Sequence, residues 1–207
     1  MFVTFEGIEG SGKSTQAQRL AALLGPDTVL SHEPGGTPLG RGVRELLLDH
    51  RYKGMATAAE VLLFFADRAE HVARVIRPAL EAGRTVVSDR FTDSSIAYQG
   101  YGRGVSLELL RAVAELATGG LRPALTVFLD VPVTVGLGRV GRRGAQDRLE
   151  SEVREFHERV RNGYLALLAQ DPDRWIKVDG RGSPDGVTAA VIAAVRGRGL
   201  RIEHGVR

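Results

Sequence analysis

The sequence contains no cysteine and no long run of apolar residues. Without cysteine, disulfides, thiolate zinc sites and cysteine nucleophiles are excluded, so any metal must be held by oxygen or histidine ligands. No stretch reaches the roughly 18 apolar residues of a membrane-spanning helix, so we expect no membrane partner. Residues 1–6 lack a basic region followed by an apolar core, so we expect no export signal and a cytoplasmic protein.

Lysine is rare, because only Lys13, Lys53 and Lys177 occur and every other residue of the Lys and Arg class is arginine. The net charge of +3 comes with acidic residues spread along the chain and no lysine-rich arm, so nucleic acid is not indicated as a partner. Arginine suits bidentate phosphate contacts better than lysine does, although a general compositional bias explains many of these residues equally well. Residues 198–207 are expected to form a frayed basic tail.

The remaining composition is that of a globular protein, with 43% hydrophobic and 26% charged residues in a chain of 207. This length fits one sizeable core, and we expect residues 1–207 to form a single domain. Short apolar runs of strand length alternate with helical patterns. The strands are expected at 2–5, 28–31, 85–88, 125–129 and 175–178, and the helices at 13–24, 39–49, 56–81, 107–117, 133–139, 151–169 and 184–196.

This alternation predicts the α/β class, with a parallel five-stranded sheet covered by helices on both faces. Ligands of such sheets bind beyond the carboxyl ends of the strands. The loop-rich stretch 136–146 is the best candidate for a short lid, which we place at about residues 136–148.

Residues 7–14, GIEGSGKS, match the phosphate-binding pattern G-x-x-x-x-G-K-[ST] between a predicted strand and a predicted helix. The glycines allow the backbone to wrap around an anion, Lys13 reaches the outer phosphates, and the Ser14 hydroxyl can ligate Mg²⁺. We therefore predict a P-loop NTPase fold of three α/β/α layers that binds a nucleoside triphosphate. The nucleotide-binding candidates are Gly7, Ile8, Glu9, Gly10, Ser11, Gly12, Lys13, Ser14 and Thr15.

Polar residues follow the other strands where the site should lie. Asp89 closes an apolar strand, as a magnesium-side carboxylate does in P-loop enzymes, and Arg90 beside it can span donor and acceptor phosphates. Glu33 and Pro34 follow the second strand, which points to a second phosphate-bearing substrate. Asp130 has the same setting as Asp89, but its local sequence favours a helix cap.

Several segments together resemble the thymidylate kinase family of nucleoside monophosphate kinases, in its bacterial form. They occur in family order within residues 1–179 and are the stretches FEG (5–7), EPGGT (33–37), FFADR (64–68), DR (89–90), SSIAYQG (94–100), LDVP (129–132) and DRLE (147–150). The resemblance implies phosphorylation of dTMP to dTDP with Mg-ATP, a direct in-line transfer, a role in dTTP synthesis and a homodimer.

Phe64 and Arg68 are four residues apart on one helical face, so an aromatic ring and a guanidinium can address a pyrimidine together. The resemblance implies that Arg68 reads thymine O4 and that Tyr98 presses on the sugar and favours deoxyribose. It also makes Ser94, Ser95 and Gln99 partners of the base or sugar. Further expected roles are the acceptor phosphate for Arg44 and the adenine edge for Arg181.

The basic residue that offsets charge on the transferred phosphoryl group is expected from the lid, because the variable P-loop positions Ile8, Glu9, Gly10 and Ser11 carry no basic side chain. The spacing does not choose among the lid arginines. Glu9 is interpreted as orienting the acceptor or a magnesium water. The lid candidates are Arg139, Arg142, Arg143 and Arg148.

Two other functions stay open at this level. A kinase for dUMP, dCMP or a deoxynucleoside would use the same P-loop and a similar acceptor pocket. A nucleotide-binding regulator with a decayed site would be expected to lack Lys13, Asp89, Arg90 or the lid arginines, and all of these are present.

Overall fold

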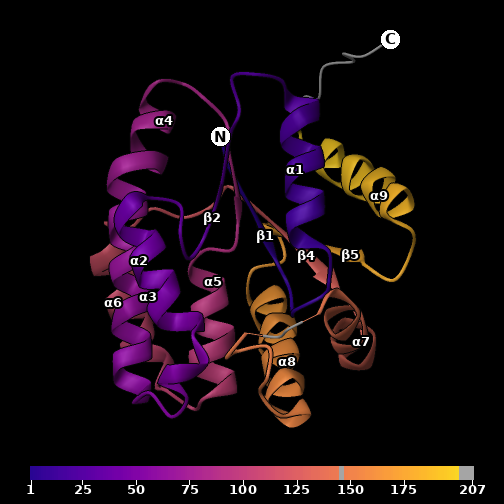
Figure 1. Cartoon of the computed structure of the whole chain (residues 1–207). Coiled ribbons are helices and arrows are strands. Elements are labelled where there is room, and N and C mark those ends of the chain that lie inside the picture. Colours follow the sequence, from indigo (N-terminus) through magenta and orange to yellow (C-terminus); the bar gives the residue numbers. More distant parts are fainter. Residues whose placement is uncertain (145–146, 201–207) are drawn as a thin grey trace.

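The computed structural model describes residues 1–144 and 147–200, and Figure 1 shows a central sheet between two helical layers. Five parallel strands form the sheet: β1 (Phe2–Glu6), β2 (Val29–His32), β3 (Val86–Asp89), β4 (Leu125–Asp130) and β5 (Trp175–Asp179). Their spatial order is β2-β3-β1-β4-β5, so β1 lies in the middle. The predicted fold class and all five predicted strands are confirmed.

Helices connect the strands and cover both faces of the sheet. They are α1 (Lys13–Leu24), α2 (Pro38–Leu48), α3 (Thr57–His71), α4 (Arg77–Glu81), α5 (Thr92–Ser95), α6 (Leu107–Thr118), α7 (Val133–Arg143), α8 (Arg154–Gln170) and α9 (Pro184–Gly197). Shorter segments are the 3-10 turn η1 (His50–Tyr52) and the π-helical segments η2 (Val72–Ile76) and η3 (Ile96–Gly102). No helix in the described part of the chain is long and apolar enough to cross a membrane.

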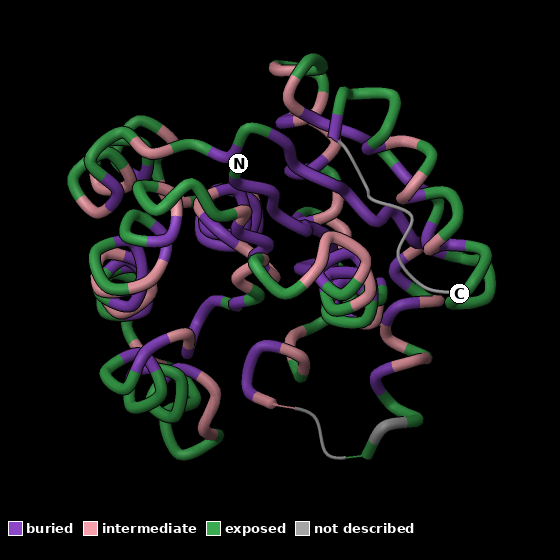
Figure 2. Tube along the Cα trace, turned by 90° about the horizontal axis from the view of Figure 1, so that it is seen from above, coloured by how far each residue is buried: buried purple, intermediate pink, exposed green. Residues whose placement is uncertain are grey.

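Along β4, successive side chains point to opposite faces of the sheet and pack into different parts of the core. Leu125, Val127 and Leu129 pack with α1 and α9, whereas Phe128 points to the opposite face and packs near α8. Successive side chains of a strand point to opposite sides, so a fully apolar strand serves two cores at once. In Figure 2, the strands of this sheet appear as buried, purple segments that run through the middle of the molecule.

The predicted helix at 56–81 is continuous in direction but contains a π-helical segment, so it divides into α3, η2 and α4. Pro78 lies in the first turn of α4, directly after the π-helical segment. The predicted cap at Asp130 is wrong, because α7 begins after Pro132 and has no side-chain cap. Asp130 instead pairs with Arg161 and Lys177, at 2.7 and 3.0 Å.

One helical region was not predicted from the sequence. Residues 92–102 form α5 and η3, although Tyr-Gln-Gly resembles a turn. The glycines serve close packing here: a Cβ on Gly100 would lie 2.5 Å from Leu107, and one on Gly102 would lie 2.7 Å from Phe156. Tertiary contact with α6 and α8 therefore overrides the low helix propensity of glycine.

The expected lid loop is wrong over much of its length, because α7 continues to Arg143. Val133, Gly136 and Val140 are spaced on one helical face and are buried beside the P-loop, which extends the helix beyond the predicted end at 139. The prediction of a frayed tail is wrong at Leu200, because this residue is buried in the core. Predictions for Ala145, Gln146 and residues 201–207 lie outside the described residues.

Candidate active site

The loop between β1 and α1 has the backbone geometry of a phosphate-binding turn. Gly7, Gly10 and Gly12 have φ values of 146°, 68° and 96°, a region that side chains disfavour. Gly10 also lies against α7, since a Cβ there would be 2.2 Å from the carbonyl oxygen of Gly136. The turn leads directly into the N-terminus of α1, whose free N–H groups and dipole favour an anion.

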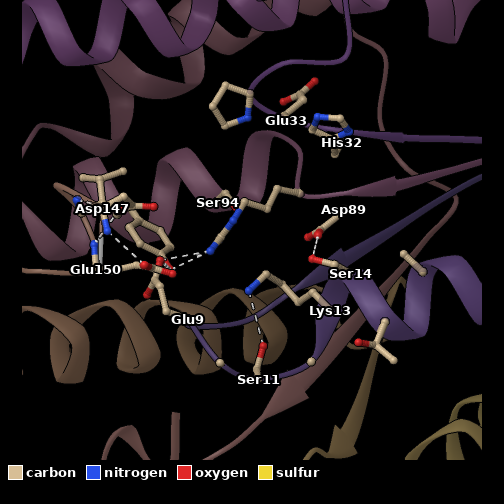
Figure 3. A pocket seen from close by; sticks show the side chains of 18 of the residues that line it. Glu9, Ser11, Lys13, Ser14, His32, Glu33, Asp89, Ser94, Asp147 and Glu150 are labelled. Atoms are coloured by element: carbon tan, nitrogen blue, oxygen red, sulfur yellow. Dashed lines mark hydrogen bonds and ion pairs between the residues drawn. The ribbon is translucent and has the colours of Figure 1, made fainter. Parts of the chain in front are cut away.

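Lys13 folds back over this loop, as Figure 3 shows. Its Nζ donates to the Ile8 carbonyl oxygen at 2.8 Å and lies 3.4 Å from Ser11 Oγ. Burial, followed by the charge of Arg90, lowers the pKa of Lys13 to about 8. An anion in the loop would favour the charged ammonium, so the site is electrostatically prepared for phosphate.

Ser14 and Asp89 face each other at the ends of α1 and β3. The Ser14 hydroxyl donates to Asp89 Oδ2, whereas Asp89 Oδ1 is buried without a hydrogen-bond partner. A hydroxyl beside a carboxylate with one unused oxygen fits Mg²⁺, which commonly takes one or two protein oxygens and completes its shell with phosphates and water. Within the described residues, no group of three His, Asp or Glu side chains forms a ready metal cage.

Arg90 follows β3 and reaches the P-loop with an unusual backbone conformation, φ 76°. Its guanidinium lies over the Tyr98 ring, 4.9 Å from the centroid, and makes five hydrogen bonds of 3.1–3.3 Å. The acceptors are Gly7 O, Ser94 Oγ, Tyr164 OH, Glu9 Oε1 and Tyr98 OH. The side chain is thus fixed beside the P-loop by groups from three other elements.

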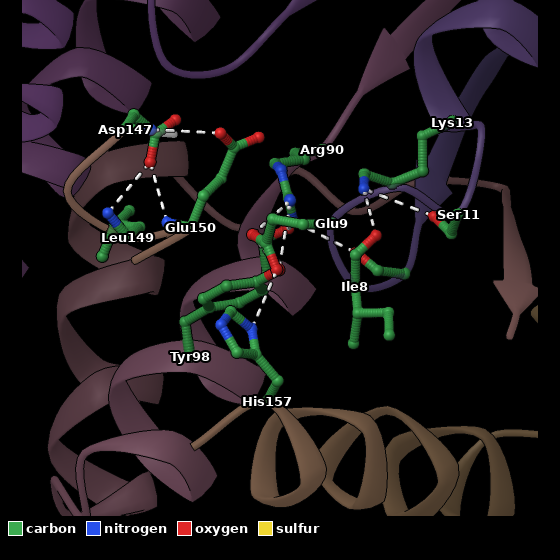
Figure 4. A network of polar contacts seen from close by, with 12 residues as sticks. Ile8, Glu9, Ser11, Lys13, Arg90, Tyr98, Asp147, Leu149, Glu150 and His157 are labelled. Atoms are coloured by element: carbon green, nitrogen blue, oxygen red, sulfur yellow. Dashed lines mark hydrogen bonds and ion pairs between the residues drawn. The ribbon is translucent and has the colours of Figure 1, made fainter. Parts of the chain in front are cut away.

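Glu9 forms the acidic centre of the network in Figure 4. Its Oε1 accepts from Tyr98 OH at 2.5 Å and from Arg90 Nη2 at 3.1 Å, and its Oε2 lies 3.2 Å from His157 Nδ1. Burial alone raises the pKa of this carboxyl, but His157, Arg90 and Lys13 together lower it to about 2. Glu9 is therefore ionised at neutral pH and anchors Arg90 electrostatically.

A second group of charged residues lies where α3 approaches β2. Arg68 is almost fully buried and donates from Nε to Glu33 Oε2 at 2.8 Å and from Nη1 to Ser95 Oγ at 2.9 Å. A third bond, of 3.0 Å, joins Nη2 to the Phe91 carbonyl oxygen. A guanidinium carries five N–H groups, so these contacts orient Arg68 without using all of its donors.

One cavity of about 770 Å³ connects the two groups. Its lining includes the P-loop together with Phe64, Arg68 and Gln99, and Arg90 lines it as well while bonding to Glu9 of the P-loop and to Tyr98. This volume lies within the usual range of ligand sites. Arg44 lines the same cavity and is steadied by a bond of 2.9 Å from its Nη1 to the Pro34 carbonyl oxygen.

A family model described as thymidylate kinase matches residues 5–191. The chain belongs to the thymidylate kinase family. The chain is 53% identical to a thymidylate kinase of Desulfovibrio desulfuricans (strain ATCC 27774 / DSM 6949 / MB), over 97% of this chain and 100% of that protein. A thymidylate kinase of Deinococcus radiodurans is 49% identical, with 96% and 98% covered.

The fold comparison agrees with the sequence comparison. The crystal structure of thymidylate kinase from Ehrlichia chaffeensis superposes with a TM-score of 0.79 at 34% identity, covering 95% of this chain and 98% of that one. Membership of the thymidylate kinase family makes this chain a kinase that phosphorylates dTMP to dTDP with ATP. The function predicted from the sequence is thereby confirmed.

Most residues predicted for the thymidylate kinase site line the shared cavity, but the lid arginines do not all do so. Arg148 is buried away from it and donates to Glu60 Oε2 at 2.8 Å and to the Leu47 carbonyl oxygen at 2.7 Å. Arg142 is exposed and does not line the cavity, and the side chain of Arg143 lies outside the described residues.

Arg139 is the lid candidate that lies against the P-loop, where it donates to the carbonyl oxygens of Gly10 and Gly180 at 3.2 and 2.9 Å. Arg181, predicted near the adenine, forms an exposed ion pair of 2.7 Å with Asp179. Its neighbours Gly180 and Gly182 line the cavity, whereas its own side chain does not.

Sequence reasoning missed three residues that build this site from a distance. Tyr164 on α8 bonds to Ser94, His157 on the same helix contacts Glu9, and Glu6 accepts from Ser94 and Tyr164 at 2.5 and 2.9 Å. Burial, followed by the charge of Asp93, raises the pKa of Glu6 to about 7. An acidic residue directly after the apolar run 2–5, at the end of a buried strand, was the available signal for Glu6, but α8 offered none.

Proposed function

We propose that the cavity carries out direct in-line phosphoryl transfer, with Mg-ATP at the P-loop and dTMP at the Phe64 and Arg68 end. The observation that carries this proposal is that one cavity is lined by the P-loop, by Phe64 and Arg68, and by Arg90, which bonds to Glu9 of the P-loop. Transfer between two phosphates requires positioning and charge stabilisation rather than covalent chemistry by the protein. The arrangement supplies both.

On the donor side, the loop Gly7 to Gly12 binds phosphates through its backbone, and Lys13 leaves its carbonyl partner to contact the outer phosphate. Ser14 and Asp89 would hold Mg²⁺, and Thr15 lies beside them in the cavity lining. A metal ion held by these residues would offset the negative charge that develops on the phosphates. The buried unpartnered Oδ1 of Asp89 supports this assignment.

Arg90 contacts the transferred phosphoryl group, and Glu9 holds its guanidinium in place through the bond of 3.1 Å. An arginine that stabilises this charge contributes about 10³–10⁵ in rate in related sites. The nucleophile needs no strong base, because a phosphate monoester has its second pKa near 6 and is largely ionised at neutral pH. Arg44 binds the phosphate of dTMP from α2.

At the other end, Phe64 stacks on the thymine and a remaining N–H of Arg68 donates to its O4. Glu33 acts on the substrate through Arg68, whose Nε it accepts at 2.8 Å. Tyr98 faces the sugar from its bond to Glu9, and Ser95 stands beside Arg68. A matched hydrogen-bond donor and an aromatic face give the pocket its preference for a thymine base.

We further propose that the chain acts as a cytoplasmic homodimer in dTTP synthesis, with a short lid at about residues 136–148. Asp147, Leu149 and Glu150 line the cavity, which supports a lid at this place. Among the lid arginines we assign Arg139 to the donor phosphates, because its side chain donates to the Gly10 carbonyl oxygen of the P-loop at 3.2 Å.

A coupled assay of ADP release tests the proposal, with Mg-ATP and dTMP, dUMP, UMP, dCMP or AMP as acceptors. We expect the highest kcat/KM with dTMP and a loss of at least about 10-fold in Phe64→Ala and Arg68→Ala, because each removes a contact to the base. Arg74→Ala is the matched control, since Arg74 is exposed on the same helical run and pairs only at the surface with Glu70. Equal activity of all three variants would refute the assigned base pocket.

A further inference from the structure

A buried carboxylate beside the pocket remains outside the roles assigned above. Glu60, on α3, is 1% exposed and accepts hydrogen bonds from three side chains. Its Oε1 accepts from Gln99 Nε2 at 2.9 Å and Arg103 Nε at 3.0 Å, and its Oε2 accepts from Arg148 Nη2 at 2.8 Å and Arg103 Nη2 at 3.1 Å. Such a site is costly for a charge unless its partners satisfy it fully.

The two arginines determine the protonation state of Glu60. Burial by itself raises the pKa of Glu60, but hydrogen bonds from Arg103 and Gln99 outweigh it and hold the pKa below its usual value. Arg148 adds a second positive charge at 2.8 Å. An ionised carboxylate can only accept hydrogen bonds. The group opposite it must therefore be a donor.

This requirement fixes the amide of Gln99. Its NH₂ group has to face Glu60, because the amide oxygen in that place would oppose a carboxylate. Gln99 lies on η3, is 1% exposed and lines the cavity together with Phe64 and Arg68. The amide oxygen, on the opposite branch of the side chain, is then the polar atom that Gln99 can offer to a ligand.

We propose that Glu60 is a positioning residue for base selection, which turns the Gln99 amide so that its oxygen accepts a hydrogen bond from the N3–H of the acceptor base. Thymine and uracil carry a proton on N3, whereas N3 of cytosine is an acceptor. The fixed amide oxygen of Gln99 can therefore accept a hydrogen bond from N3–H of thymine or uracil, but it cannot pair with N3 of cytosine. This inference rests on the proposed function, because it places the base beside Phe64 and Arg68.

The test compares dUMP with dCMP, which share the sugar and differ only at N3 and at the substituent on C4. The wild-type enzyme should prefer dUMP in kcat/KM by about 10-fold or more, because dCMP leaves the buried amide oxygen of Gln99 unpaired. In Glu60→Gln, a neutral amide can accept from or donate to Gln99, so its orientation is no longer imposed. The substituent on C4 contributes equally in both enzymes, so we expect the preference for dUMP to fall by about 10-fold in this variant.

Arg103→Gln is the matched control, because it removes a charge from the same cluster but leaves Arg148 to keep Glu60 ionised. It should keep the wild-type preference, which a merely structural role of the cluster would not predict. If Glu60→Gln fails to fold, the charge-balanced double variant Glu60→Gln, Arg103→Gln takes its place and should show the lowered preference.

The outcomes separate this inference from the proposed function. Unchanged preference for dUMP over dCMP in folded Glu60→Gln or the double variant would overturn the role of Glu60, with the kinase site intact. Equal use of both substrates by the wild type would overturn the contact between Gln99 and N3–H. If Phe64→Ala and Arg68→Ala turn over dTMP as well as the wild type does, the proposed base pocket itself is refuted.

Discussion

Gly10 is the P-loop residue whose replacement the structure constrains most tightly. An alanine there would combine a φ of 68° with a Cβ placed 2.2 Å from the carbonyl oxygen of Gly136. Gly54 provides a control for the first effect alone, because its φ is 84° and nothing lies within 4 Å of its Cβ position. The left-handed conformation costs an alanine about 1–2 kcal/mol, so Gly54→Ala should lower Tm by about 2–8 °C.

Gly10→Ala must additionally move the P-loop and α7 about 1 Å apart, because both contacting groups are backbone. A displacement of that size in a catalytic site costs about 100-fold in rate. We therefore expect a Tm loss larger than that of Gly54→Ala together with a fall in kcat of about 100-fold, measured by thermal melts and the ADP-release assay. Gly54→Ala should keep kcat.

Gly136→Ala approaches the same contact from α7, where its Cβ would lie 2.5 Å from the Glu9 carbonyl oxygen. Here the backbone is helical, so alanine would gain about 1 kcal/mol of propensity and any loss must come from the clash. We expect it to lower both Tm and kcat. If Gly136→Ala melts higher than the wild type and Gly10→Ala keeps its kcat, the close packing of α7 on the P-loop does not govern activity.

Four further predictions concern charge and assembly. Because burial lowers the pKa of Lys13 to about 8, the free enzyme loses this cation as the pH rises through 8, and kcat/KM for ATP should fall above that pH in a steady-state profile. Asp89→Asn should raise the Mg²⁺ concentration for half-maximal rate by at least about 10-fold in a metal titration, and an unchanged value would remove Asp89 from the metal site. Arg148→Ala should lower Tm by about 6–12 °C, from the roughly 3 kcal/mol lost when a buried ion pair is broken, whereas Arg74→Ala should shift it by at most about 2 °C. Light scattering should give twice the chain mass of 22.3 kDa, and a monomer in the active fraction would contradict the proposed dimer.

The donor end of the site was predictable because its signals are local. The P-loop pattern stands between an apolar strand and a helix, so residues 7–15 could be placed together from the sequence. Asp89 could be joined to Ser14 because parallel strands end at the same edge of the sheet. The structure places these two side chains in contact.

The rest depends on contacts between distant segments, which no local pattern encodes. Arg148 stands beside the lid glycines in sequence, yet its partners Glu60 and Leu47 come from α3 and α2. Tyr98 and Gln99 belong to a π-helical segment stabilised by close packing on α6 and α8, although their sequence resembles a turn. The positioning of Arg90 by Tyr164, from α8, arises in the same way.

Arg90 shows why these distant contacts matter for catalysis. Its left-handed backbone costs about 1–2 kcal/mol and is tolerated because five acceptors hold the guanidinium in one place. The ionised Glu9 at their centre keeps an opposite charge beside the cation before any substrate binds. A cation already oriented needs little reorganisation when negative charge develops on the transferred phosphoryl group, and preorganisation of this kind is the main electrostatic contribution of an enzyme. Under the proposed mechanism, Tyr164 and His157 of α8, which do not line the cavity, would act on the reaction through the position of Arg90.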